Sequence, residues 1–233
     1  MGTMPDHASA LQLILTGDPA LLAIVRLSLG VSLAAVALAA VIGMPAGALL
    51  ALTRFPGRSV IIVVLNAMMG LPPVVVGLAL YLLLSRAGPL GSLGILFTPA
   101  AMVIAQTVLI VPIIAALTRQ TVEDLWSEYR DELHAMDVGA VGRMTTLLWD
   151  ARFSLLTTLL AGFGRAAAEV GAVMIVGGNI DGFTRTMTTT VALETSKGNL
   201  PLAMGLGAIL LAIVLVINGA AWGTRVWSQR VTG

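Results

Sequence analysis

Long apolar segments constrain the fold of this chain more than any other feature of its sequence. A helix crosses the hydrocarbon core of a bilayer with about 20 consecutive apolar residues. The apolar segments of that length, or close to it, cover residues 20–52, 60–84, 100–117, 153–176 and 200–222. Charged residues are sparse in these long segments. A transmembrane barrel would instead show short segments in which apolar and polar residues alternate. The pattern therefore predicts an all-α integral membrane protein with about five transmembrane helices.

The composition supports this class and excludes several chemistries. Hydrophobic residues make up 58% of the 233 residues and charged residues 11%, far from the averages of soluble domains. There is no cysteine for a disulfide or a thiolate ligand, and a net charge of +1 indicates no nucleic-acid partner. The chain has no phosphate-binding loop, no HExxH motif and no Gly-x-Ser-x-Gly turn, so we expect no ATPase, catalytic or metal site in it.

Two other classes of membrane protein are alternatives at this point, a secondary transporter and an intramembrane enzyme. A secondary transporter normally shows an internal repeat, and five spans do not divide into two equal halves. A membrane subunit that is driven by a partner fits the absence of these motifs better.

A polar segment, residues 118–152, separates the third apolar segment from the fourth. Its first part has apolar residues at helical spacing, which predicts an amphipathic helix. These residues are Val122, Leu125, Trp126, Tyr129, Leu133 and Met136. Thr121 and Asp124 are placed to cap the start of that helix, and Gly139 is placed to turn the chain into a second short helix, 140–149. An ordinary solvated loop and a docking site for a soluble partner both fit this pattern.

Two features interrupt the apolar segments. Pro72 and Pro73 break the hydrogen-bond ladder of the second segment, as a structural kink or as part of a transport path. Arg165 and Glu169, four residues apart, are the ionisable residues deep inside the fourth. Buried charges are costly in a membrane, so they pair with each other or face a cavity. An internal salt bridge and a contact with substrate therefore both remain open.

The basic residues predict the orientation, because Lys and Arg accumulate in cytoplasmic loops. One side of the predicted spans carries Arg54, Arg58, Arg119, Arg130, Arg143, Arg152, Arg225 and Arg230. The other side carries Arg86, Arg185 and Lys197. We therefore expect the polar segment and the C-terminus in the cytoplasm and the N-terminus outside. No Lys or Arg precedes Arg26, so we expect no cleaved signal peptide and a retained N-terminus.

The polar segment resembles the cytoplasmic coupling loop of binding-protein-dependent ABC importer permeases. The signature of that loop runs Glu-Ala-Ala, three residues, Gly, then nine residues before Ile-x-Leu-Pro. Aligned on Gly139, the first triplet falls on residues 133–135, where Ala135 matches. The acidic anchor is absent or is supplied by Asp131 or Glu132. The resemblance implies that an ATPase docks on Leu133, His134, Ala135, Gly139, Ala140 and Arg143.

Three further stretches are similar to the permeases for molybdate and tungstate, and closest to the tungstate type. They are RFPGR at 54–58, LPPVVVGLALYLLL at 71–84 followed by GPLG, and GFGRAAAEVGAVMIVGGNIDGFTRTMTTTVALETSKGN at 162–199. The similarity implies a single permease domain over 1–233, of the type I importer fold, in the cytoplasmic (inner) membrane of a bacterium. It also implies import of an oxyanion, tungstate first and molybdate or another oxyanion as the alternative.

The resemblance further implies partners and a path through the membrane. Two copies of the chain would form the pore within the lipid bilayer, and two cytoplasmic ATPase subunits would bind ATP and Mg, so that this chain binds no cofactor itself. An extracytoplasmic binding protein would deliver the oxyanion. A path for a dianion should be polar without strong anion traps. The candidate lining or gate residues are Pro72, Pro73, Asn179, Thr186, Thr188 and Thr189.

Overall fold

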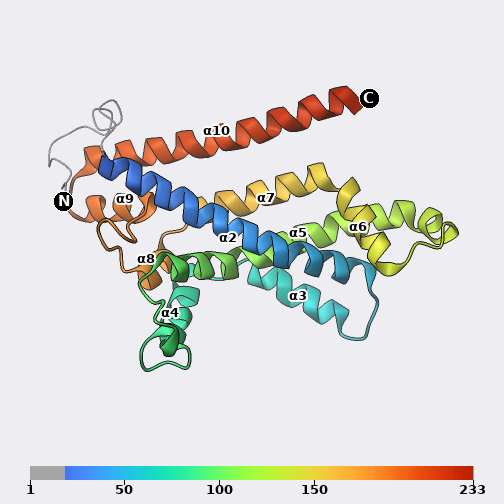
Figure 1. Cartoon of the computed structure of the whole chain (residues 1–233), viewed down its shortest axis with the longest axis horizontal. Helices are drawn as coiled ribbons and strands as arrows, with labels where there is room; N and C mark the ends of the chain where they lie inside the picture. The colour runs from blue at the N-terminus through green and yellow to red at the C-terminus, as the bar shows by residue number, and fades with distance from the viewer. Residues whose placement is uncertain (1–18, 233) are drawn as a thin grey trace. The chain divides into compact units, whose positions relative to one another are not determined.

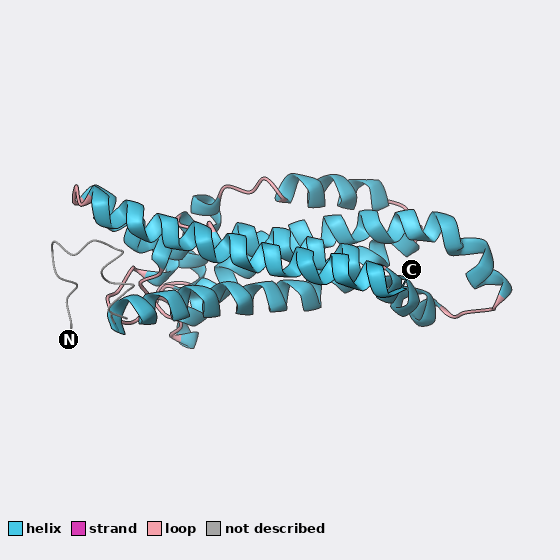
Figure 2. Cartoon of the chain, turned by 90° about the horizontal axis from the view of Figure 1, so that it is seen from above, coloured by secondary structure: helices cyan, strands magenta, loops and turns pink. Residues whose placement is uncertain are grey.

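The computed structural model describes residues 19–232, with side chains for 19–220. The expectation of a retained N-terminus concerns residues 1–18, which lie outside the described part. The side chains of Arg225 and Arg230 also lie outside it. Every regular element described is helical (Figure 1, Figure 2). These elements are α2 (Pro19–Leu52), α3 (Arg58–Met68), α4 (Pro73–Leu84), η1 (Gly91–Leu93), α5 (Pro99–Ala135), α6 (Ala140–Asp150), α7 (Arg152–Ala167), α8 (Gly171–Gly177), α9 (Met187–Ser196) and α10 (Leu200–Thr232). The predicted all-α architecture is therefore confirmed.

Three described helices are long and apolar enough to cross a membrane, namely α2, α5 and the Leu200–Ala220 part of α10. Two further pairs qualify when each is taken as one bent span, α3 with α4 at 100° and α7 with α8 at 60°. The chain is thus a multi-pass membrane protein with three to five candidate spans. The first bend follows from Pro72 and Pro73, which stand at the start of α4 and have no backbone N–H to donate.

The third apolar segment and the amphipathic helix of the polar segment form one continuous helix, α5, of 37 residues. The expected helix start at Thr121 is wrong. The Thr121 hydroxyl instead donates to the Leu117 carbonyl, one turn back in the same helix, at 3.0 Å. A hydroxyl bonded in this way lies along the helix without interrupting its backbone ladder. α5 therefore joins the apolar part of the chain to the polar segment without a break.

The stretch 177–199, between the fourth and fifth apolar segments, is polar and rich in Thr, and it contains the helix α9. Thr186 caps this helix, and Thr186 and Thr189 form a reciprocal capping box. A Thr three residues after the cap replaces the usual Glu or Gln, so the sequence signal is weak. The helix was therefore missed.

Contacts group the chain into two compact units. Among the described residues, unit 1 comprises 19–35, 72–106 and 164–232, and unit 2 comprises 36–71 and 107–163. Residues of α2, α5 and α7 belong to both. Within unit 1, α4 packs on α8 and α9 packs on α10 (Figure 1). A buried cluster of Leu21, Leu202 and Leu206 lies in this unit.

Small residues bring α2 close to α5 within unit 2. A Cβ added to Gly43 would lie 3.1 Å from Cγ2 of Ile114. One added to Gly47 would overlap the Ala115 carbonyl. Glycine permits this approach because it has no side chain. Helices in a membrane associate through close backbone packing of this kind.

Candidate functional site

α5 and α6 meet in a tight turn inside the polar segment, within unit 2. Asp137 has a left-handed backbone conformation, with φ 50°. Its N–H donates to the His134 carbonyl, and the next N–H, of Val138, donates to the Leu133 carbonyl at 3.1 Å. This pair of bonds is a Schellman motif, which ends a helix with one left-handed residue. Val138 also packs against the buried cluster that contains Leu133, and an apolar contact of this kind often accompanies the motif.

Gly139, which we expected to make this turn, does not need to be glycine within the described structure. Its backbone is extended, with φ −66° and ψ 166°, a conformation open to any residue. A Cβ added there meets no described atom within 4 Å. The turn expectation is therefore corrected: Asp137 holds the left-handed position, and Gly139 is the residue before α6. A role for Gly139 in docking stays a prediction.

Two other predicted docking residues, His134 and Arg143, pack around Trp126. The ring centroids of His134 and Trp126 are 5.6 Å apart. The guanidinium carbon of Arg143 lies 5.7 Å from the Trp126 ring centroid, within range of a cation–π contact. Arg143 Nε also donates to the Val138 carbonyl at 2.6 Å. These side chains tie α6 to the end of α5.

The predicted apolar stripe of α5 packs against α6 and the end of α2, with one exception. The buried members of this cluster are Ala48, Ala51, Val122, Leu133 and Leu147. Around them lie the partly buried stripe residues Leu125, Trp126 and Tyr129. Met136 is 65% exposed, so its assignment to the stripe is wrong. The helical spacing no longer applies there because α5 ends at Ala135.

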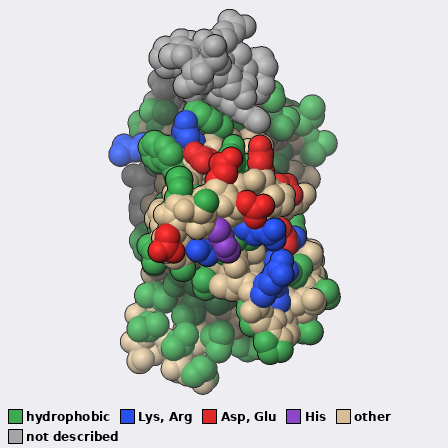
Figure 3. All heavy atoms as spheres, turned by 90° about the vertical axis from the view of Figure 1, so that its right-hand side faces the viewer, with side chains coloured by type: hydrophobic (Ala, Val, Ile, Leu, Met, Phe, Trp, Pro, Cys, Tyr) green, Lys and Arg blue, Asp and Glu red, His purple; other side chains and the backbone are tan. Residues whose placement is uncertain are grey.

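α6 turns other apolar side chains away from this cluster. Val141 is 72% exposed and Trp149 69% exposed, whereas Leu147 is fully buried. Figure 3 views the side on which the α5–α6 turn lies in Figure 1, and acidic and basic side chains gather there beside apolar ones. The exposed acidic residues of the polar segment are Asp124, Glu128, Asp131, Glu132, Asp137 and Asp150. Exposed apolar groups rimmed by charge are typical of a protein-docking surface.

The two broken spans meet in unit 1, where α4 packs on α8. A Cβ added to Gly77 would lie 2.8 Å from Cα of Ala172, and one added to Gly171 would lie 2.9 Å from a methyl of Val74. Val74 directly follows the Pro72 and Pro73 pair. The proline break that the sequence predicted therefore lies beside the break between α7 and α8.

Glu169 lies in that second break and is 3% exposed. One carboxylate oxygen accepts from the Ala172 N–H at 3.0 Å, and the other lies 3.9 Å from Nη2 of Arg165. The Glu169 carbonyl accepts from the Thr188 hydroxyl at 2.8 Å. The expectation of an Arg165 and Glu169 pair on one continuous helix is wrong, because α7 ends at Ala167. The ion pair exists, but the carboxylate also holds the start of α8.

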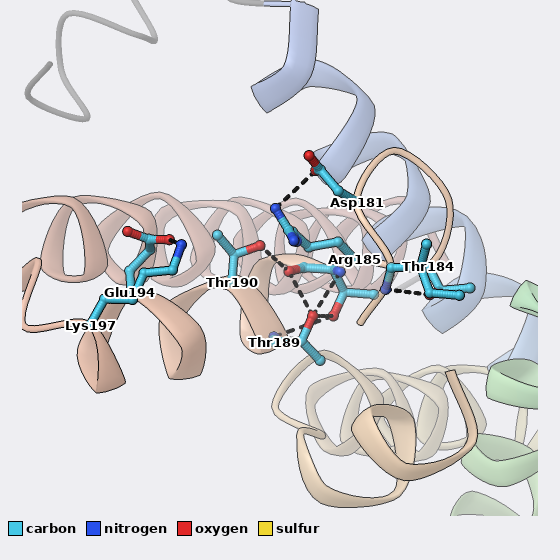
Figure 4. Close-up of polar contacts among 9 residues, drawn as sticks. Asp181, Thr184, Arg185, Thr189, Thr190, Glu194 and Lys197 are labelled. Atoms are coloured by element: carbon cyan, nitrogen blue, oxygen red, sulfur yellow. Dashed lines mark hydrogen bonds and ion pairs between the residues drawn. The ribbon is translucent and has the colours of Figure 1, made fainter. Parts of the chain in front are cut away.

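The predicted lining residues Thr186, Thr188 and Thr189 lie at the start of α9. The Thr186 N–H donates to the Thr189 hydroxyl at 2.9 Å, and the Thr190 hydroxyl donates to the Thr186 carbonyl at 2.6 Å (Figure 4). The Thr186 hydroxyl is 3.2 Å from that of Thr188. Thr186 and Thr189 are buried. These hydroxyls stabilise the helix start, and their contact with a passing oxyanion stays a prediction.

Asn179 lies in the loop after α8 with a left-handed backbone, φ 49°. The loop around it is closed by its own contacts. The Thr184 hydroxyl accepts from the Ile180 N–H at 2.9 Å, and Arg185 pairs with Asp181 at 2.9 Å (Figure 4). The side-chain oxygen of Asn179 is buried and has no hydrogen-bond partner among the described residues. A polar atom at this predicted lining position is thus left for a ligand or for water.

Comparison with known proteins decides the family. A "Probable anion ABC transporter permease protein" of Haloferax volcanii is 43% identical over 88% of this chain and 90% of that protein. The tungstate uptake system permease protein TupB of Peptoclostridium acidaminophilum is 37% identical over 93% of this chain and 95% of TupB. The chain belongs to the anion ABC transporter permeases. A search of protein-family models finds no match to this permease.

TupB of Campylobacter jejuni is a third relative of the permease, 35% identical over 71% of this chain and 69% of TupB. The resemblance to molybdate and tungstate permeases, drawn from the residues of the sequence, is thereby confirmed. A coupling role for the α5–α6 turn of the permease and a gating role for its paired breaks stay predictions.

Sequence reasoning missed several residues that position these regions. Asp137 forms the turn. The Ser28 hydroxyl accepts from the Met187 N–H at 2.7 Å, which joins α2 to the start of α9. Gln106 donates to the Ala166 carbonyl at 3.1 Å, near the end of α7. A lone polar residue on an apolar helix was the available signal at the last two positions.

Proposed function

We propose that this chain is the membrane permease subunit of an ABC importer that moves tungstate into the cytoplasm. The observation that carries the proposal is the pair of tungstate uptake permeases at 37% and 35% identity. Molybdate or another oxyanion is the alternative substrate. These relatives do not favour a secondary transporter.

The proposed complex contains two copies of the chain, two cytoplasmic ATPase subunits and an extracytoplasmic oxyanion-binding protein. We assign ATP and Mg to the ATPase subunits, because the sequence of this chain has no phosphate-binding loop, and we propose no cofactor for the chain itself. The N-terminus lies outside the cytoplasmic membrane of a bacterium and the C-terminus inside, as the basic residues of the loops indicate.

The polar segment couples the ATPase to the path in this proposal. The ATPase contacts the exposed face of α6, which carries Val141 and Trp149. The Schellman turn and the Arg143 contact on Trp126 resist independent motion of α6. α5 runs as one helix from Pro99 to Ala135, with Pro112 inside it, so in this proposal a displacement of α6 passes into a helix and is not lost in a flexible loop.

Reconstitution into proteoliposomes tests the function. The permease is combined with its ATPase and binding protein, and tungstate and molybdate in the lumen are measured by elemental mass spectrometry. We expect ATP-dependent accumulation of tungstate in preference to molybdate. Preference for molybdate would overturn the choice of oxyanion, and accumulation without the ATPase would overturn the ABC mechanism.

A further inference from the structure

Unit 2 contains a pocket of about 210 Å³ between the end of α2, the start of α3 and the polar part of α5. Its lining residues are Ala51, Leu52, Arg54, Arg58, Glu123, Trp126, Ser127 and Arg130. Three arginines and one glutamate give this lining an excess of two positive charges. The pocket shares no lining residue with the exposed face of α6 or with the paired breaks.

The one acidic group of the lining is already neutralised. One oxygen of Glu123 accepts from Arg58 at 2.8 Å, and the other accepts from Arg119. Arg58 Nε also donates to the Leu50 carbonyl at 2.9 Å. These contacts join α2, α3 and α5 and hold one wall of the pocket in place. Glu123 therefore does not cancel the charge of the remaining arginines.

Arg54 and Arg130 are the cations available to a ligand. The Arg54 side chain has no hydrogen bond or ion pair within residues 19–220. Arg130 lies 3.3 Å from Asp131, whose side chain is 91% exposed. An ion pair that is so exposed to water contributes little to stability. A pocket lined by two arginines whose ion-pair partners are weak or absent is suited to bind an anion. Phosphate is the best candidate, because a guanidinium group can donate two parallel hydrogen bonds to it.

The surroundings distinguish a lipid from a free anion. The pocket lies at the polar end of α2, a candidate membrane span. Beside it, α3 has no buried residue, and Val60, Ile61 and Val63 are 47–66% exposed. Basic pockets between transmembrane helices at the cytoplasmic surface bind anionic headgroups, and aromatic rings such as Trp126 favour the same depth. A free anion would use the arginines alone, whereas a phospholipid uses the arginines and the apolar face.

We propose that this pocket binds the phosphate headgroup of an anionic phospholipid, with the acyl chains along α3. Arg54 and Arg130 donate to the phosphate oxygens, and the Arg58, Glu123 and Arg119 contacts hold the wall behind them. The lipid would clamp the α2–α3 connection to the same end of α5 that carries the coupling turn. The inference does not rest on which oxyanion the permease transports.

Native mass spectrometry of the purified full chain tests this site with phosphatidylglycerol and phosphatidylcholine as probes. We expect preferential retention of phosphatidylglycerol. Removing both charges, Arg54→Gln with Arg130→Gln, should weaken that binding by about 30-fold, at roughly fivefold per arginine. The control Arg86→Gln removes an exposed charge from the connector between α4 and α5 and should change nothing.

The single changes Arg54→Gln and Arg130→Gln, each expected to weaken binding about fivefold, keep the test valid if the double variant fails to fold. Excess inorganic phosphate is the competing probe and should not displace the lipid. Equal retention by the wild type and the double variant would overturn the site. Equal retention of the two lipids would overturn its anion selectivity, and displacement by inorganic phosphate would reassign it to a free anion.

Discussion

At the scale of single residues, the coupling turn depends on the backbone of Asp137. A β-branched residue is strained in the left-handed conformation, so Asp137→Val should destabilise the permease by about 1–3 kcal/mol. Asp137→Gly should be tolerated, because glycine adopts that conformation freely. The matched control Gly139→Ser should leave stability unchanged, since serine suits an extended N-cap. Thermal unfolding in detergent measures all three, and an equal loss in Gly139→Ser would refute the assignment to Asp137.

The ion pair of Arg165 and Glu169 gives a second prediction for single residues. Glu169→Gln keeps an oxygen for the Ala172 N–H but leaves Arg165 without its counter-charge, so the yield of folded protein should fall. Adding Arg165→Met should restore the yield. Pairing Arg165→Met with Glu169→Met should restore less, because the buried N–H then lacks an acceptor, at about 1–3 kcal/mol. Yield and uptake are measured together. If the double variant Arg165→Met with Glu169→Gln folds but does not transport, Arg165 lies on the path instead.

At the scale of elements, the contact of α4 with α8 depends on Gly77. Gly77→Ala should destabilise the permease by about 1–3 kcal/mol, because the added carbon overlaps Ala172. Gly30→Ala should stabilise it by up to about 1 kcal/mol, because alanine favours helix and no described atom lies within 4 Å of the added carbon. The two changes should thus shift the thermal midpoint in opposite directions. An unchanged or raised midpoint for Gly77→Ala would contradict the close contact of α4 with α8, and a lowered midpoint for Gly30→Ala would contradict the open space around Gly30.

The exposed face of α6 gives a second prediction for an element. Trp149→Ala should reduce copurification of the ATPase by roughly tenfold or more, since tryptophans buried at interfaces often contribute about 2 kcal/mol or more. The control Leu211→Ala truncates a side chain of similar exposure, 65%, on α10. It should leave the complex intact. Retention of the ATPase by the Trp149→Ala variant at the wild-type level would remove α6 from the docking surface.

At the scale of the whole molecule, orientation is the property to test. The chain has no cysteine, so Ser127→Cys and Ser92→Cys each introduce one reactive site. Both residues are exposed, in the polar segment and in the α4–α5 connector. An impermeant thiol reagent added to intact cells should label the Ser92→Cys variant and spare the Ser127→Cys variant. The reverse pattern would invert the proposed topology.

The sequence by itself determined the class of this protein, the places of its long apolar helices and its family. A helix that spans a bilayer needs a sufficiently long apolar segment, so the apolar segment 20–52 predicted the bounds of α2 almost to the residue. Pro72 and Pro73 predicted the bend before α4. The RFPGR and GGNI strings pointed to the family before any comparison. These properties depend on local composition and on short motifs, which a sequence carries directly.

The tertiary structure alone decided which residue turns the chain after α5, where α7 ends and what Glu169 binds. Asp137 and Gly139 are both plausible turn residues, and the packing of Val138 against the buried cluster that includes Ala48 and Ala51 of α2 favours the first. Glu169 follows Arg165 at helical spacing, yet its carboxylate bonds to Ala172 because α8 begins there against α4. A backbone angle or a partner of this kind depends on contacts between segments far apart in the chain, and no local pattern specifies them.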